Sequence, residues 1–114
     1  TPEPFITGYT APPGKALFVV ANRSTENDYG QVTVAGGSFG GGREIKIDPN
    51  SEIALELEPA DDYRAVWTSP AYGGVTGGRE FKASAGEVIL GWIIPEDREI
   101  FMQFPGQPPE QINQ

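Results

Sequence analysis

Apolar and polar residues alternate with a period of two along most of this chain, and this pattern constrains the fold more than any other feature. Side chains two residues apart lie on the same face of a β-strand, so each alternating run predicts a strand with one buried face. Six runs of this kind are bounded by Gly, Pro, Asn or Asp. The residues expected on the buried face of each run are Val32 and Val34; Ile45 and Ile47; Ile53, Leu55 and Leu57; Tyr63, Ala65 and Trp67; Phe81 and Ala83; and Ile100, Met102 and Phe104.

Two further runs, residues 16–21 and 88–94, are apolar on both faces. Such runs suit central strands that are covered on both sides. Residues 23–28 carry the only helix-like signals, but this stretch is short and polar, so we expect a hairpin connection between the first two strands. The chain is therefore predicted to be all-β, a single-domain antiparallel β-sandwich of about seven to eight strands, either Ig-like or prealbumin-like.

Glycine and proline divide the chain into regions. The 114 residues include 15 glycines and 11 prolines, and proline is concentrated near both ends. We expect a Pro-rich N-terminal segment over residues 1–14, a β-sandwich domain over residues 15–105 and a polar C-terminal tail over residues 106–114. Because proline keeps a chain extended without tertiary support, the two terminal segments are predicted to be tethers.

An internal correspondence links two parts of the domain. The residues Gly-Gly-Arg-Glu at positions 41–44 recur at positions 77–80, within a pseudo-repeat that relates residues 41–69 to residues 77–105. A duplicated three-strand meander would produce this pattern, and so would similar hairpins that converged in a chain rich in Gly and Glu. Each copy follows a glycine-rich loop, and we expect the two loops to lie near one another and to form a contact surface.

Composition excludes several classes of function. The chain has no Cys and no His, which rules out Ser-His-Asp and Cys-His nucleophiles, Cys/His zinc sites and disulfides. The formal net charge of −8 disfavours nucleic acid and anionic membrane surfaces as partners. No apolar run approaches the roughly 20 residues of a membrane-spanning helix, so we expect no transmembrane segment.

The remaining residues offer little catalytic chemistry. The glycine-rich loop at residues 36–42 lacks the Lys and Ser/Thr of a phosphate-binding loop and leads into a strand. Acidic turns offer oxygens of the kind that calcium prefers, but without the spacing of a calcium motif. Paired carboxylates could act in hydrolysis, yet the Glu residues occupy the outward positions of predicted strands. We expect no enzyme activity, no cofactor and no metal.

Aromatic residues give the best candidates for a binding surface. Tyr63 and Trp67 fall on core-facing positions, and Trp92 lies in a run that is apolar on both faces, so we expect all three to pack in the core. Better candidates for exposure are the aromatic residues in or beside predicted turns, namely Tyr9, Tyr29, Phe39 and Tyr72. Two arginines, Arg43 and Arg79, begin the repeated strands beside the glycine-rich loops. The candidate partner or ligand surface therefore consists of Tyr9, Tyr29, Phe39, Arg43, Tyr72 and Arg79.

The order of these segments resembles a family of small extracytoplasmic modules. An apolar strand at residues 16–22 precedes Leu-Glu-Leu-Glu-Pro at 55–59, Tyr-Arg-Ala-Val-Trp at 63–67 and Phe-x-Ala-x-Ala-Gly-Glu at 81–87. This order is similar to PEGA-like and carboxypeptidase-regulatory-like β-sandwich modules. The chain departs from their pattern at residues 59–62, where the family has Pro-Gly, and in its long glycine-rich loops. The resemblance implies a sandwich outside a prokaryotic cell and no catalytic residues.

These observations favour a non-enzymatic, exported module that makes protein–protein contacts as an accessory or structural subunit of an envelope or extracellular assembly. We expect a protein partner or a homo-oligomer, and an extracytoplasmic location, either secreted or held at the envelope through an anchor upstream of Thr1, as in a lipoprotein. An ordinary cytosolic domain with frayed ends is the alternative location. The alternative function is binding of a carbohydrate or small ligand through exposed loop aromatics.

Overall fold

A computed structural model describes residues 6–26, 28–69 and 74–113. Nine strands and two short 3-10 turns account for the regular structure of these residues. The elements in chain order are β1 (Ala16–Asn22), β2 (Gly30–Ala35), η1 (Gly37–Phe39), β3 (Arg43–Ile47), β4 (Ser51–Leu57), β5 (Ala60–Ser69), β6 (Val75–Ala83), β7 (Val88–Ile94), η3 (Pro95–Asp97), β8 (Glu99–Gln103) and β9 (Glu110–Gln111).

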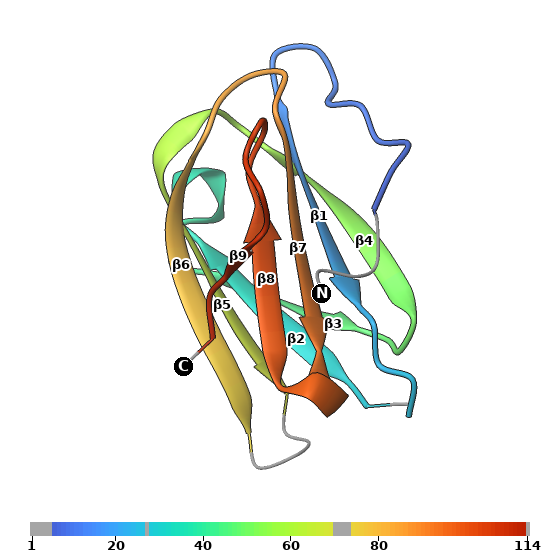
Figure 1. Ribbon diagram of the computed structural model, residues 1–114. Coiled ribbons are helices and arrows are strands. Elements are labelled where there is room, and N and C mark those ends of the chain that lie inside the picture. The colour runs from blue at the N-terminus through green and yellow to red at the C-terminus, as the bar shows by residue number, and fades with distance from the viewer. Residues whose placement is uncertain (1–5, 27, 70–73, 114) are drawn as a thin grey trace.

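The strands form two packed sheets, which confirms the predicted all-β sandwich (Figure 1). One sheet has five strands in the order β4-β1-β7-β8-β9, and the other has four in the order β3-β2-β5-β6. All strand pairs are antiparallel except β1 and β7, which run parallel and pair Phe18 with Ile89 and Val20 with Gly91. The two runs that are apolar on both faces are β1 and β7, and they are central strands as expected.

The main core lies between the two sheets and is rich in aromatic side chains. Trp67 and Tyr63 of β5 are fully buried there, as predicted from the alternation. The ring of Phe18 in β1 meets that of Trp67 edge-on, with the ring centroids 6.4 Å apart. Gly91 in β7 faces Trp67 so closely that a Cβ atom at this position would lie 2.5 Å from the indole ring. The missing side chain at Gly91 therefore makes room for Trp67.

The N-terminal segment covers the outer face of the five-stranded sheet. Ile6 is only 7% exposed, and it packs with Trp92 and Phe101 in a second apolar cluster that Tyr9 and Ala11 extend. The expected tether over residues 1–14 is therefore wrong from Ile6 onward, because Ile6, Tyr9 and Ala11 pack on the outward side chains of β1 and β7. Trp92 is buried, as predicted, but beneath this segment rather than between the sheets.

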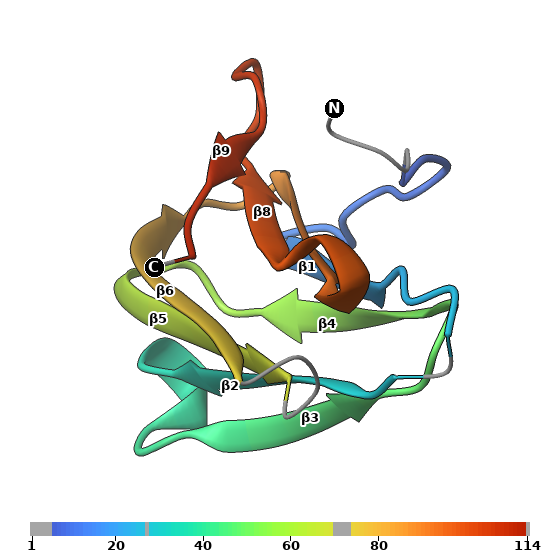
Figure 2. The same cartoon turned by 60° about the horizontal axis from the view of Figure 1, so that its bottom comes forward.

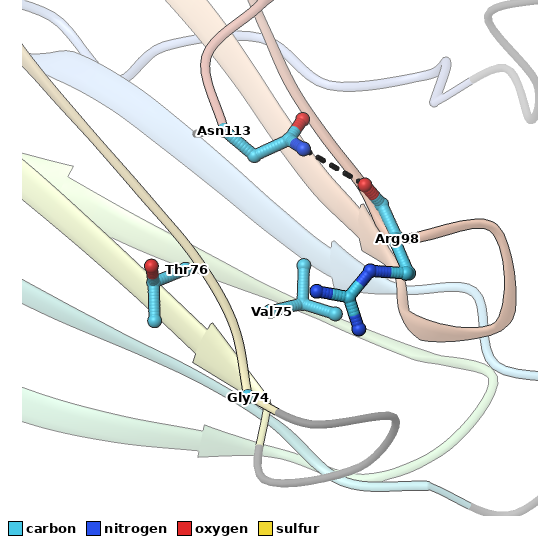
Figure 3. A pocket seen from close by; sticks show the side chains of 5 residues that line it. All are labelled: Gly74, Val75, Thr76, Arg98 and Asn113. Atoms are coloured by element: carbon cyan, nitrogen blue, oxygen red, sulfur yellow. Dashed lines mark hydrogen bonds between the residues drawn. The ribbon is translucent and has the colours of Figure 1, made fainter.

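The C-terminal tail is also part of the fold. β9 pairs with β8, and an isolated bridge joins Asn113 to Gly77 of β6, so this segment links the two sheets at one side. The Asn113 side chain accepts a hydrogen bond from the Ile100 amide at 3.1 Å and donates one to the Arg98 carbonyl at 2.8 Å. Figure 3 shows this second bond beside a small polar hollow of about 130 Å³. The prediction of a free tail is thus corrected.

Two further expectations about connections are wrong. Residues 23–28 do not form a hairpin, because β1 and β2 belong to different sheets and the segment crosses between them. The three-strand meander is also contradicted: β3 and β4 lie in different sheets, as do β4 and β5. Of the strands in the second repeat, β7 and β8 pair with one another, whereas β6 belongs to the other sheet. The two repeats thus share a sequence pattern without sharing a pairing pattern.

The described parts of the two glycine-rich stretches lie at opposite ends of β5. β2 and β5 are antiparallel, with Ala35 opposite Arg64 and Gln31 opposite Thr68. The turn after β2, which contains η1, is therefore next to the beginning of β5, whereas residues 75–77 of the second stretch pair with residues 67–69 at the end of β5 (Figure 1). The expected paired-loop surface is consequently wrong.

Candidate functional site

The four sheet edges differ in how they are protected. β6 is an edge strand, but the C-terminal segment covers it at Gly77, and Arg79 forms an ion pair with Glu110 at 2.8 Å. β9, the edge of the other sheet on that side, has only two residues. At the opposite side, β3 and β4 each pair with one strand among the described residues, β3 with β2 and β4 with β1. Figure 2 shows β3 at the margin of its sheet. One side of the sandwich is thus closed and the other is open.

The open strand β3 alternates buried isoleucines with exposed charges. Ile45 and Ile47 point into the core, whereas Glu44 and Lys46 are exposed on the outer face and Arg43 is exposed at the start of the strand. Alternate residues of an edge strand direct both their N–H and C=O groups away from the sheet. β3 therefore presents free backbone groups flanked by charged side chains.

The charged side chains of β3 face no opposite charge directly across the pair with β2. Across the pair with β2, Glu44 faces Thr33 and Lys46 faces Gln31. Within the described part of the chain, neither Glu44 nor Arg43 takes part in a salt bridge. These charges are therefore available to a partner.

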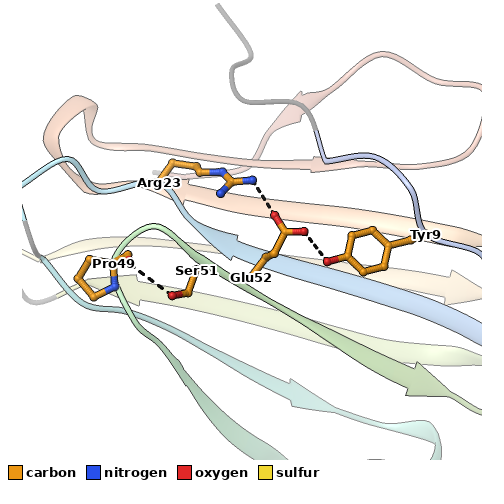
Figure 4. Close-up of polar contacts among 5 residues, drawn as sticks. All are labelled: Tyr9, Arg23, Pro49, Ser51 and Glu52. Carbon is orange, nitrogen blue, oxygen red and sulfur yellow. Dashed lines mark hydrogen bonds and ion pairs between the residues drawn. The ribbon is translucent and has the colours of Figure 1, made fainter.

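The charges of β4 are, in contrast, already matched. Arg23 forms an ion pair with Glu52 at 2.8 Å, and Tyr9 donates a hydrogen bond to the same carboxylate (Figure 4). The hydrogen bond from Tyr9, together with Arg23, lowers the pKa of Glu52 below its ordinary value and outweighs the opposing effect of burial. Directly after the end of β4, Glu58 forms an ion pair with Lys15 at 2.8 Å. The side chains along β4 are thus held by neighbours in their own chain.

A shallow hollow lies beside β3 on the outer face of the four-stranded sheet. It measures about 320 Å³ and is lined by Tyr29, Gly30, Gln31, Lys46 and Thr68. Tyr29 is 47% exposed, and the Lys46 ammonium lies 3.9 Å from the centre of its ring. The ammonium covers one face of the ring in a cation–π contact, so Lys46 belongs both to the hollow and to the strand edge.

The other candidate residues do not join this region. Tyr9 lies over the five-stranded sheet, on the opposite side of the sandwich. Phe39 packs on the core, with its ring centre 6.3 Å from that of Tyr63. Arg79 lies over Phe104 and pairs with Glu110, so it holds the C-terminal segment. Tyr72 lies outside the described residues. Of the predicted residues that the structure describes, Tyr29 and Arg43 are the two at or beside the β3 edge.

A cluster of hydrogen bonds around Glu96 fixes the crossover between β1 and β2. The Glu96 carboxylate in η3 accepts hydrogen bonds from the hydroxyls of Ser24 at 2.9 Å and Thr25 at 3.1 Å, and from the Glu26 amide at 2.7 Å. Burial acts to raise the pKa of Glu96, but these hydrogen bonds prevail and hold it below its ordinary value. The contact is a structural clamp between two connections.

Metal and membrane features add nothing to the candidate site. Over residues 6–26, 28–69 and 74–113, no three Asp, Glu, Cys or His side chains gather closely enough to hold a metal ion. The same residues contain no helix of the length and apolarity needed to cross a membrane.

No protein-family model, curated protein sequence or solved structure matches the chain. The site therefore rests on its own geometry.

Sequence reasoning missed Glu44 and Lys46, the two central residues of the site. Their outward positions follow from the alternation with Ile45 and Ile47, which was recognised. The missing information was that β3 is an edge strand, because the same alternation occurs in an edge strand and in an inner strand.

Proposed function

We propose that this domain is a non-enzymatic module that makes protein–protein contacts through the open edge of its four-stranded sheet, as a structural or accessory subunit of an assembly. The observation that carries the proposal is the asymmetry of the edges: the C-terminal segment closes one side, whereas on the other side no described segment pairs with the outer edge of β3. An extended segment of a partner adds to such an edge through main-chain hydrogen bonds.

The composition of the edge supports this proposal. Exposed edge strands usually carry charges that discourage unspecific pairing, and β3 has three within five residues. A partner strand with complementary charges would be accepted, while an apolar strand would leave these charges unmatched. The resemblance to PEGA-like and carboxypeptidase-regulatory-like modules, and with it an Ig-like sandwich and an extracytoplasmic location, remains part of the proposal.

Site-specific photo-crosslinking tests the proposal. A photoreactive residue replaces Lys46 on β3 in one variant and Lys82 on β6 in the matched control, since both lysines are exposed on strands of the same sheet. In extract of the native source, we expect a covalent adduct from position 46 and none from position 82. The mass of the adduct distinguishes a second copy of the chain from another protein. Equal labelling at the two positions, or no adduct at all, would contradict the proposal.

The hollow beside β3 favours a second candidate function, the binding of a glycan or small ligand. It combines an exposed aromatic ring with amide, hydroxyl and ammonium groups from Gln31, Thr68 and Lys46, and such a combination suits stacking and hydrogen bonding to a sugar. Calorimetric titration with a glycan panel tests it. Binding should be lost in Tyr29→Ala and retained in Tyr9→Ala, because Tyr9 lies on the other sheet. Absence of heat with every glycan would end this candidate.

A further inference from the structure

From the charges of β3, and resting on the proposed function, we infer that the partner of this edge is a second copy of the same chain. The two copies pair β3 with β3 antiparallel around a two-fold axis at Ile45, and the two four-stranded sheets become one continuous sheet. Such an isologous contact uses the same surface on both copies, so the strand has to be complementary to itself.

The sequence of β3 has this self-complementarity. With Ile45 opposite the partner's Ile45, Glu44 lies opposite the partner's Lys46, and the two-fold axis creates the same pair a second time. Glu44 and Lys46 are on the outer face and Ile45 is on the inner face. Opposite charges therefore meet directly across the seam, on the same face of the joined sheet, where cross-strand pairs interact most strongly.

In the dimer, Glu44 and Lys46 each face an opposite charge directly across the strand pair, which they do not have in the single chain. Across β2 they face only the neutral residues Thr33 and Gln31. The dimer supplies each Glu44 with a lysine and each Lys46 with a carboxylate, and Lys46 can keep its contact with Tyr29 because that ring lies on its own chain.

The other open edge does not offer the same match. β4 exposes Glu52 and Glu56 and no basic side chain, so pairing of β4 with itself gathers carboxylates at the seam. Pairing of β3 with β4 of another copy would bring Lys46 near a carboxylate, but it would leave Glu44 facing a strand without a basic side chain. The β4 carboxylates Glu52 and Glu56 already have Arg23 and Lys15 within 4.0 Å in their own chain. Pairing of β3 with β4 would also leave one β3 and one β4 free, and would produce open-ended chains rather than a closed dimer.

Charge reversal tests both the contact and its register. Sedimentation analysis of the wild-type chain should show a dimer that dissociates on dilution and on addition of salt. Glu44→Lys places two lysines together at each of the two symmetric positions, and Lys46→Glu places two carboxylates there. Each single variant should raise the dissociation constant of the dimer about tenfold. The double variant Glu44→Lys/Lys46→Glu should recover the wild-type value, since each pair is restored in reverse.

Mixing the two single variants is the most selective arm of the experiment. One chain then carries Lys at positions 44 and 46 and the other carries Glu at both, so every pair across the seam is opposite in charge. The mixture should form a heterodimer, although each variant alone is largely monomeric. Lys82→Glu on β6 is the matched control. It should leave the dissociation constant of the dimer at the wild-type value, because position 82 is exposed but lies at the opposite side of the sheet from β3.

Three results would overturn the inference: a wild-type chain that stays monomeric at millimolar concentration, single variants that dimerise as well as the wild type, or open-ended oligomers. Failure of the inference is distinguishable from failure of the proposed function. A monomeric chain that still yields an adduct with a different protein from position 46 contradicts the second copy alone. A chain that gives no adduct with any protein, including itself, contradicts both.

Discussion

At the scale of single residues, the closed side of the sandwich depends on Gly77. A Cβ atom on this glycine would lie 2.7 Å from the Cα of Asn113 and 2.8 Å from the Ile112 carbonyl oxygen. Its neighbour Gly78 points to the other face, where the nearest atom, the Ala65 carbonyl oxygen, would be 3.5 Å away. Gly77 thus allows the C-terminal backbone to approach β6, and Gly78 offers a matched comparison.

Gly77→Ala should therefore destabilise the domain and release the C-terminal segment. We expect the free energy of unfolding to fall by about 1–3 kcal/mol, as for overpacking in a closely packed region. Urea denaturation measures this change, and limited proteolysis reports on the release of residues 112–113. Gly78→Ala should have little effect on either. Equal behaviour of the two variants would contradict the role given to Gly77.

Glu96 provides a second prediction at this scale, through the pH dependence of stability. Its pKa in the folded protein is below the ordinary value of about 4.3. A lowered pKa contributes stability that is present above the unfolded pKa and is lost as pH falls through the folded pKa. Glu96→Gln should reduce the free energy of unfolding by about 1 kcal/mol at pH 7, because the charge-assisted hydrogen bonds are weakened at a partly exposed site.

The measurement for this prediction is denaturation of both proteins across pH. The difference between the wild type and Glu96→Gln should shrink as the pH falls below the ordinary pKa of a glutamate, about 4.3, and through the lower pKa of folded Glu96, since the wild-type carboxylate then becomes neutral. Glu80→Gln, which changes an exposed residue whose nearest ion pair is 3.7 Å long, is the control. A difference that is constant with pH would show that the clamp does not depend on charge.

At the scale of elements, the faces of strands could be predicted from the sequence and their partners could not. The alternation identified the buried residues Val32, Tyr63, Trp67 and Phe81 because side-chain direction is a local property of a strand. Pairing is set by contacts between distant segments, so the crossover at residues 23–28 resembled a hairpin. The same limit hid the edge position of β3, and with it the importance of Lys46.

The terminal segments show a second limit. Proline near Ile6 and Tyr9 suggested a tether, since an extended segment without regular structure has no periodic signal. The apolar outer face of β1 and β7 was recognised, but what covers it could not be deduced from local pattern.

Removal of the N-terminal segment tests its structural role. A chain that begins at residue 12 lacks Ile6, Tyr9 and Ala11, so the outer face of β1 and β7 around Trp92 becomes exposed. The loss should lower the free energy of unfolding by about 3 kcal/mol, the order expected for one to two buried side chains. It should also shift tryptophan emission to the red and increase the binding of an apolar dye.

The control for this truncation is Tyr9→Phe, which keeps the ring and loses only the hydrogen bond to Glu52. It should change stability far less than the truncation and leave the emission unchanged. Unaltered emission in the truncated chain would contradict the placement of the segment over Trp92.

At the scale of the whole molecule, the two sides of the sandwich are different in kind. The side with β6 and β9 is closed by the C-terminal segment and by the pair of Arg79 with Glu110. The side with β3 and β4 is open, and its β3 edge has unmatched charges. The excess of glycine and proline that suggested mobile loops and tethers instead supports close backbone approach at Gly77 and packing at the N-terminus.

Amide hydrogen exchange of β3 is the most direct measurement of the central claim that this edge is the contact surface. In dilute solution, the outward amides of residues 43–47 should exchange rapidly while those of β5 are protected. At high concentration, or with the crosslinked partner bound, the β3 amides should become protected and those of β6 should not change. The claim is contradicted if the β3 amides exchange at the same rate in the free and the bound state while another surface gains protection.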